Sequence, residues 1–222
     1  MKIIALSDNH SDYGFETPEG DILIHAGDFS YQGLSQEIYT FAGWLKRQPH
    51  EHKLFIWGNH ELIESDELYY RNFIEENSGA KCIHTLREPL EINGVKFWGS
   101  SYTPTFGNWA FMKDDKQRKG YWEIAPDDVD VVVCHGPMWG MLDTVDGLEI
   151  EPGKLEHLGC VHLRNYIERV KPRLFIHGHI HDSGRQTFHL KHWDGEPDTI
   201  CVNAALMDEN YKIAGNPIEI EI

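Results

Sequence analysis

Five short apolar runs constrain the fold of this 222-residue chain more than any other feature of its sequence. Each run is nearly continuous, rich in β-branched residues and bounded by turn residues, as strands buried on both faces of a sheet are. They occupy residues 2–7, 21–27, 53–58, 129–134 and 173–178. Helical patterns lie between several of them, at 35–48, 64–78 and 154–171. This alternation predicts an α/β fold in which helices flank central sheets.

Further strands are expected in the β-rich parts of the chain. Residues 89–100 form a predicted hairpin, because Asn93-Gly94 supplies the positive φ angles of a type I′ turn. Other strands are predicted at 82–86, 185–193, 198–204 and 216–222. No linker or internal repeat divides the chain, so we expect a single domain over residues 1–222. The long loops at 101–128 and 136–153 are more typical of functional segments than of simple connections.

The charge and hydropathy of the chain exclude two classes of partner. Twenty Lys and Arg residues against 36 Asp and Glu residues give a formal net charge of -16. Such a field repels phosphate backbones, so we expect no binding to nucleic-acid polymers. No apolar run approaches the roughly 18 residues of a membrane span, and the first residues lack the pattern of a signal peptide. We therefore expect no membrane partner and a cytoplasmic location, and leave a homodimer open.

All five apolar runs are followed by residues that commonly bind metals. Ligands of open α/β sheets gather at the carboxyl ends of strands, so these side chains are expected to meet in one crevice. A single histidine after a strand is more often structural than functional, but five runs with the same ending are not expected by chance. The residues are Asp8 and His10, Asp28, Asn59 and His60, His135, and His179 and His181.

Local spacing supports the same interpretation. The segments Asp-Asn-His and His-Ile-His each place two donors two residues apart, on the same side of an extended backbone. Glycine directly precedes Asp28, Asn59 and His179, which allows a sharp turn and a close approach to a ligand. Carboxylate, imidazole and amide donors without a thiolate suit Mn, Fe, Ni or Zn. The four scattered cysteines form no CxxC pair and are predicted to be reduced and buried.

The ordered motifs DxH, GD, GNHE, HGP and GHIH resemble those of the calcineurin-like metallophosphoesterase superfamily. The segments PRLFIHGHIH and VNAALMDENYKIAGNPIEI, among others, are similar to the small metallophosphoesterase-domain-containing proteins along almost the whole chain. The resemblance implies a four-layered α/β/β/α sandwich with two central mixed β-sheets. It also implies two divalent metal ions between the sheets, with Mn favoured and Fe, Zn or Ni as alternatives.

The same resemblance assigns a role to each candidate residue. Asp8, His10 and His181 would hold one metal, Asn59, His135 and His179 the second, and Asp28 would bridge both. Two divalent ions and two carboxylates leave a surplus of about two positive charges, enough to bind a phosphate oxyanion in an acidic protein. A metal-bridging hydroxide would attack the phosphorus, and His60 and Asp28 are the residues expected to matter most for catalysis.

His60 is expected to lie outside the metal shell and to face the substrate. Consecutive side chains of extended backbone point to opposite sides, so His60 should point away from its neighbour Asn59. As a general acid, or as a donor to the phosphate oxygens, it would contribute about 10²–10⁴-fold to the rate. Glu61 either orients His60 or supplies charge at a helix N-terminus.

The substrate is predicted to be a small phosphoester, and two enzyme classes fit the metal core. A phosphodiesterase, with cyclic nucleotides as the best candidates, is the leading hypothesis, and a phosphomonoesterase or protein phosphatase is the alternative. A regulator that has lost turnover is less consistent with the intact GNHE and GHIH motifs. Substrate contacts are predicted at Asn59, His60, Trp109, Arg118 and Trp139. The loop aromatics, which include Tyr121 and Trp122, would either stack a base or form a satellite core.

Overall fold

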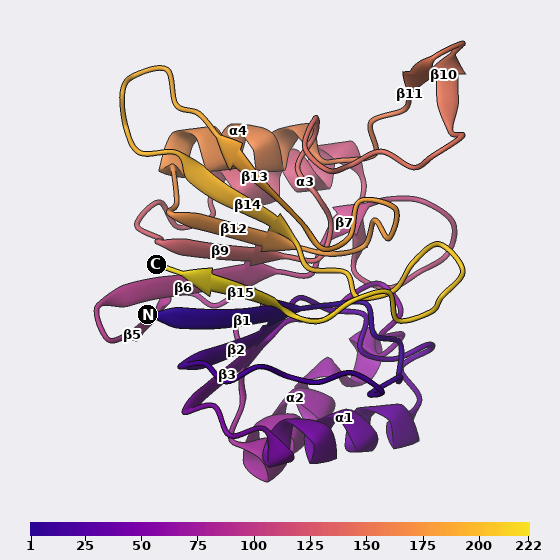
Figure 1. Ribbon diagram of the computed structural model, residues 1–222, viewed down its shortest axis with the longest axis vertical. Coiled ribbons are helices and arrows are strands. Elements are labelled where there is room, and N and C mark those ends of the chain that lie inside the picture. The colour runs from indigo at the N-terminus through magenta and orange to yellow at the C-terminus, as the bar shows by residue number, and fades with distance from the viewer.

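Two β-sheets pack face to face at the centre of the structure, a computed structural model that describes residues 1–222 (Figure 1). Helices α1 and α2 cover the outer face of one sheet, and α3 and α4 cover the outer face of the other. The helices are α1 (Ser35–Arg47), α2 (Glu67–Ser78), α3 (Asp115–Glu123) and α4 (Val161–Val170), with a 3₁₀ turn η1 (Glu64–Asp66) before α2. This arrangement confirms the predicted α/β/β/α sandwich.

The first sheet has the strand order β15-β1-β2-β3-β4. Strands β1 to β4 run parallel, and β15 pairs with β1 in the antiparallel sense. Its strands are β1 (Lys2–Leu6), β2 (Ile22–His25), β3 (His52–Phe55), β4 (Lys81–Cys82) and β15 (Ile218–Glu221).

The second sheet has the order β13-β14-β12-β9-β6-β5, in which the four central strands are parallel and both edge strands are antiparallel. Its strands are β5 (Leu90–Ile92), β6 (Val95–Ser100), β9 (Val131–Cys134), β12 (Leu174–His177), β13 (Gln186–Leu190) and β14 (Thr199–Asn203). Asn93 and Gly94 have φ angles of 51° and 78°, so the turn between β5 and β6 has the predicted positive φ values. Two small ribbons lie outside the sheets: β7 (Thr103–Pro104) with β8 (Met112–Lys113), and β10 (Glu149–Glu151) with β11 (Lys154–Leu155).

Alternate residues of each central strand enter different cores. Ile3 and Ala5 of β1 belong to the core between the sheets, whereas Ile4 and Leu6 pack towards α1 and α2. A third core, which includes Trp122 of α3, lies between the second sheet and its helices. Both faces of the central strands are therefore buried, which explains why their sequences read as continuous apolar runs. None of the helices has the length and apolar character that a membrane span requires.

Three expectations about local structure were wrong. Helix α3 lies inside the segment predicted as a loop, because its residues are mostly polar and only Trp122 is buried. The helix expected from residue 154 begins only at Val161, since residues 154–155 pair with β10. The strand expected at 82–86 ends at Cys82, and only an isolated bridge from His84 to Gly99 follows it.

The carboxyl ends of the parallel strands of both sheets lie at the same end of the sandwich, away from the chain termini (Figure 1). The sheets meet there through an isolated bridge between Ser7 and Ala205. Backbone hydrogen bonds also link the strand ends, from Asp8 N–H to the Gly27 carbonyl and from Gly178 N–H to the His135 carbonyl. The fold thus brings the five predicted strand ends together.

Candidate metal centre

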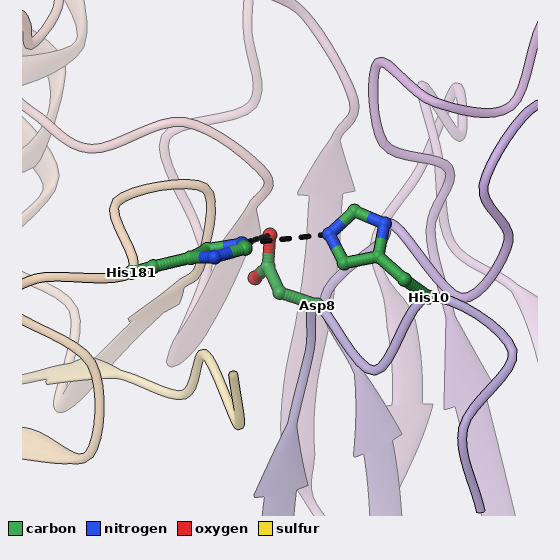
Figure 2. Close-up of side chains that lie close together, drawn as sticks. All are labelled: Asp8, His10 and His181. Atoms are coloured by element: carbon green, nitrogen blue, oxygen red, sulfur yellow. Dashed lines mark hydrogen bonds and ion pairs between the residues drawn. The ribbon is translucent and has the colours of Figure 1, made fainter. Parts of the chain in front are cut away.

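Asp8, His10 and His181 form the first of three groups of side chains that could hold a metal ion. A carboxylate oxygen of Asp8 lies 3.5 Å from Nε2 of His181, and Nε2 of His181 lies 3.4 Å from Nε2 of His10 (Figure 2). Figure 2 shows the two imidazole rings on opposite sides of the carboxylate. Asp8 and His10 follow β1, whereas His181 follows β12, so the two sheets supply this group jointly.

The tautomers of these histidines are fixed by backbone carbonyls. Nδ1 of His10 donates to the Ser30 carbonyl at 3.1 Å, and Nδ1 of His181 donates to the Asp208 carbonyl at 3.0 Å. Because a carbonyl only accepts, each neutral ring presents an unprotonated Nε2 to the other. Two such lone pairs face each other favourably only with a proton or a cation between them. This donor set therefore fits a metal ion, and the Nδ1 hydrogen bonds are those that orient metal-binding histidines.

A second group contains Asp28, His135 and His179. Nε2 of His135 lies 3.3 Å from the Asp28 carboxylate and 2.9 Å from Oδ1 of Asn59. Nδ1 of His135 donates to the Ala26 carbonyl at 2.9 Å, so this ring is oriented in the same way as those of the first group. The His179 ring packs edge-on against His135, with the ring centroids 5.0 Å apart.

The third group joins Asp28 to His10 and His60. Asp28 is thus the one residue that the second and third groups share, which is consistent with the bridging role expected of it. Nε2 of His60 lies 4.0 Å from the Asp28 carboxylate, and Nδ1 donates to the Tyr31 carbonyl at 2.8 Å. His60 therefore lies nearer to the ligand set than the sequence indicated.

The expectation that His60 points away from Asn59 was wrong. Both residues line the same cavity, because the chain beyond β3 is a turn and not extended backbone. The backbone N–H of His60 donates to the Asp28 carboxylate at 2.9 Å and thereby fixes this turn against the loop that follows β2.

Close backbone approach shapes the site at two glycines. A Cβ atom at Gly58 would overlap the Asp28 carboxylate, and one at Gly178 would overlap the Asp8 carboxylate and the Ser7 hydroxyl. These are the approaches that the sequence predicted for glycines before ligands. Four candidate ligands also have left-handed backbone, a strained conformation for residues other than glycine that is common at functional sites. They are Asp8, His10, Asp28 and His179, with φ of 52°, 39°, 54° and 70°.

Glu61 has a role that sequence reasoning missed. Its buried carboxylate accepts hydrogen bonds from the N–H groups of Asp28, Ser30 and Gly58 at 3.0, 2.9 and 2.6 Å, and from the Ser30 hydroxyl at 2.7 Å. It neither orients His60 nor lies at a helix N-terminus, and it fixes the loop after β2 to the loop after β3. Burial raises the pKa of Glu61 to about 8.

The carboxyl groups of Asp8, Asp28 and Glu61 are buried, and that of Asp28 interacts with both of the others. Asp8 and Asp28 form ion pairs with histidines only, and Glu61 forms none. Burial alone would raise the pKa of Asp8, but the adjacent imidazoles of His181 and His135 hold it below its usual value. The pKa of Asp28 is likewise lowered against burial by His135. Burial lowers the pKa of His135, yet Asp28 outweighs it and raises that pKa to about 9. Asp8 and Asp28 are therefore ionised although they are buried, and histidines are the only groups paired with them, which favours a site for divalent ions.

A cavity of about 560 Å³ opens beside these groups. Of the predicted substrate contacts, Asn59, His60 and Trp109 line it, and the Trp109 ring stacks on His60 with centroids 4.2 Å apart. Phe106, one of the loop aromatics expected either to stack a base or to form a satellite core, also lines the cavity. So do Glu156 and Tyr211, which sequence reasoning did not single out as substrate contacts. Tyr211 lies outside the five metal-binding motifs, and its ring contacts with His10 and His181 identify it.

The predictions for Arg118 and Trp139 were wrong, because neither residue lines the cavity. The Arg118 guanidinium binds the Lys113 carbonyl and the Asp115 carboxylate at the start of α3, and Trp139 packs against His157. Trp122 is buried in the core under α3, and the ring of Tyr121 packs against it, so these two aromatics form the satellite core.

Comparisons with known proteins agree with this geometry. The family model described as calcineurin-like phosphoesterase matches residues 1–183. Metallophosphoesterase domain-containing protein 1 of Homo sapiens is 33% identical over 243 residues, covering 100% of this chain and 71% of the human protein. UPF0046 protein K07C11.7 of Caenorhabditis elegans is 31% identical, covering 98% of this chain and 74% of the worm protein. TT1561 of Thermus thermophilus, a crystal structure with 13% identity, superimposes with a TM-score of 0.61 over 99% of this chain and 98% of its own.

Proposed function

Since this chain belongs to the calcineurin-like phosphoesterase family, whose chemistry is metal-dependent hydrolysis of phosphoric esters, we propose that it hydrolyses small phosphodiesters, cyclic nucleotides included. The observation that carries the proposal is the pair of imidazole Nε2 atoms of His10 and His181, which face each other beside the Asp8 carboxylate with both Nδ1 atoms bound to carbonyls. This arrangement is stabilised by a bound cation.

We assign the ligands of two ions accordingly. Asp8, His10 and His181 would hold one ion, Asn59, His135 and His179 would hold the other, and Asp28 would be shared. Divalent ions bound there would supply polarisation of the phosphoryl group and a nucleophile at neutral pH. Mn suits the mixed nitrogen and oxygen donors, with Fe, Zn and Ni as alternatives.

The protein residues then position the ester. His60 is oriented by the Tyr31 carbonyl so that Nε2 faces the cavity, where it contacts a phosphoryl or leaving oxygen and donates a proton when protonated. Trp109 stacks on His60 and offers an aromatic surface to the organic part of the substrate.

Two properties of the cavity support diesters over monoesters. No lysine or arginine lines it, so only the metal centre can balance phosphate charge, and a diester monoanion demands less balance than a monoester dianion. The volume of about 560 Å³ also leaves room for a second ester arm beside the phosphate.

One comparison tests the substrate class. The value of kcat/KM is measured for bis-p-nitrophenyl phosphate, p-nitrophenyl phosphate and a set of cyclic nucleotides, with Mn, Fe, Zn or Ni added separately. We expect a preference for the diester and turnover of at least one cyclic nucleotide. A clear preference for p-nitrophenyl phosphate, without turnover of any cyclic nucleotide, would assign the protein to the phosphomonoesterases instead.

Metal content provides a separate test. Protein reconstituted with Mn is expected to contain about two equivalents per chain. Asp28→Asn is expected to lower the content and to remove most of the activity, because its carboxylate serves both ions. A stoichiometry of one or less in the unaltered protein would contradict the binuclear assignment.

A further inference from the structure

The part of the cavity wall outside the ligand set has an unusual chemical composition. It is mainly apolar, with Phe106 and Trp109 from the segment between β7 and β8, and Leu148 and Leu158 from the segment between β9 and α4. This part contains one carboxylate, that of Glu156, and no lysine or arginine. A ligand arm in the cavity therefore meets apolar surface, aromatic rings and one negative charge.

The charge of Glu156 is not balanced by the protein. The side chain is exposed and forms neither an ion pair nor a hydrogen bond, although its backbone N–H donates to the Leu148 carbonyl at 2.8 Å. The next residue, His157, is directed elsewhere and binds Asp143 at 2.8 Å. The Glu156 carboxylate is thus free to accept a hydrogen bond or ion pair from a ligand.

The segment that carries Glu156, residues 139–160, is fixed at its base. The buried Asp143 accepts hydrogen bonds from two backbone N–H groups and from His157, and these bonds hold the two ends of the segment together. The Ser183 hydroxyl binds the Leu142 carbonyl at 2.8 Å, and the Asp182 carboxylate accepts an N–H from this segment at 2.7 Å. Only the β10–β11 hairpin stands away from the body of the molecule (Figure 1). Glu156 therefore belongs to a wall attached to the chain directly after His181.

We propose, as an extension of the proposed function, that Glu156 determines which phosphodiesters are preferred. It does so through the charge of the organic group esterified to the phosphate, here called the organic arm. It favours phosphodiesters whose arm carries an ammonium group or an N–H donor, and it disfavours arms with a second anionic group. A donor on the arm pairs with the free carboxylate, and the aromatic rings of Trp109 and Phe106 add attraction for a cation. A second anion meets repulsion from Glu156 in a protein whose formal net charge is already -16.

Three p-nitrophenyl diesters that differ only in the second arm test the proposal: 2-aminoethyl, ethyl and 2-carboxyethyl. For the Mn-loaded protein we expect kcat/KM to decrease in that order. In Glu156→Gln the kcat/KM of the aminoethyl ester should fall about 3- to 10-fold, that of the carboxyethyl ester should rise by a similar factor, and that of the ethyl ester should hardly change. High salt should reduce the differences in kcat/KM among the three esters in the unaltered protein, because salt screens exposed charges. Glu151→Gln, an exposed glutamate of the same segment that does not line the cavity, is the matched control.

Equal values for the three esters in the unaltered protein, or an unchanged order in Glu156→Gln, would overturn the proposal. The result is separable from that of the proposed function. If no diester is hydrolysed, calorimetry of 2-aminoethyl, ethyl and 2-carboxyethyl phosphate binding to the Mn-loaded protein measures the same preference without turnover. The same order of affinity, lost in Glu156→Gln, would support the role of Glu156, and equal affinities would overturn it.

Discussion

Individual side chains at this site are oriented mainly by the backbone. His10, His135 and His181 each donate Nδ1–H to a carbonyl, and His60 does the same to Tyr31. Each carbonyl belongs to a loop that follows a strand or to a turn of the same region. The imidazoles are therefore held with Nε2 towards the site before any ion binds, which lowers the cost of assembling the centre.

His60 is expected to affect rate more than metal content. Although its Nε2 lies 4.0 Å from the Asp28 carboxylate, the ligands assigned to each ion are complete without it. His60→Ala should retain about two equivalents of Mn and lose roughly 10²–10⁴-fold in kcat. Elemental analysis and bis-p-nitrophenyl phosphate kinetics on the same preparation measure both quantities. Loss of an equivalent of metal would instead make His60 a ligand.

Gly178→Ala should damage the metal centre although glycine has no side chain to contribute. The added Cβ would overlap the Asp8 carboxylate and the Ser7 hydroxyl, so Asp8 must move. We expect metal affinity to fall about 10- to 100-fold, as for lost support of a ligand. Gly120→Ala, at a position where a Cβ meets nothing within 4 Å, is the control and should retain affinity. Unchanged affinity in Gly178→Ala would show that the site can relax around the methyl group.

Sequence patterns predicted this site better than its surroundings, for a physical reason. The position of a residue close to the end of a buried strand is set by the sheet, so Asp8, Asp28 and His135 could be placed from the strand pattern alone. Glu61 and Tyr211 act through contacts between loops, and no local periodicity encodes such contacts. The cation expected at Arg118 instead binds groups near its own helix.

Among the elements, the segment between β9 and α4 is the least predictable from sequence. Its first part was correctly expected to be an irregular loop. The β10–β11 ribbon and the late start of α4 were not expected, because the two strands are only three and two residues long and mostly exposed. The central strands and α1 were predicted well, since their burial imposes a clear hydrophobic pattern. Buried Met138, Met141 and Cys160 fix the ends of this segment in the third core. The hydrogen bonds of Asp143 hold the part between them.

Asp143 should therefore influence substrate binding from a position that does not line the cavity. Removal of its carboxylate leaves two backbone N–H groups and His157 without their acceptor, which frees the wall that includes Leu148 and Glu156. We expect Asp143→Ala to raise KM about tenfold for a diester with a large arm and to change kcat little. Asp143→Asn keeps one acceptor oxygen, so its KM should rise less than that of Asp143→Ala. Asp146 is an exposed residue of the same segment, and Asp146→Ala should leave KM unchanged. An equal loss of kcat would indicate damage to the metal centre instead.

For the whole molecule, histidine burial links stability to pH. Burial lowers the pKa of His84 to about 3, and its Nδ1 accepts the Ser101 N–H, so the folded protein keeps this ring neutral. Burial likewise lowers the pKa of His25 to about 3 and that of His177 to about 4. His135 has the opposite shift, because Asp28 outweighs burial and raises its pKa to about 9.

These shifts predict a stability maximum near pH 6.5 for the metal-free protein. Below an unfolded-state pKa of about 6.5, the unfolded chain binds protons at His25, His84 and His177, whereas the folded protein keeps these rings neutral. The free energy of unfolding therefore falls as the pH falls towards 4. Above pH 6.5 the folded protein holds a proton at His135 that the unfolded chain releases. The stabilisation from His135 is therefore lost as the pH rises towards about 9.

Denaturant unfolding of the chelator-treated protein between pH 4.5 and 9 measures the free energy of unfolding on both sides of this maximum. Its fall towards low pH is the acid limb, and its fall towards high pH is the alkaline limb. Each buried histidine contributes at most about 1.4 kcal/mol per pH unit, so His84→Gln should make the acid limb shallower by up to that amount. His189→Gln, an exposed histidine, should leave the slope unchanged. Saturating Mn should remove the contribution of His135 to the alkaline limb, because a metal at His135 displaces its proton and itself stabilises the folded state. Glu61, whose pKa burial raises to about 8, adds to the same limb at lower pH. An acid limb of the same slope in His84→Gln would exclude this histidine as its source. A slope that Mn leaves unchanged above about pH 8, where Glu61 is already ionised, would contradict the assignment of His135 as a ligand.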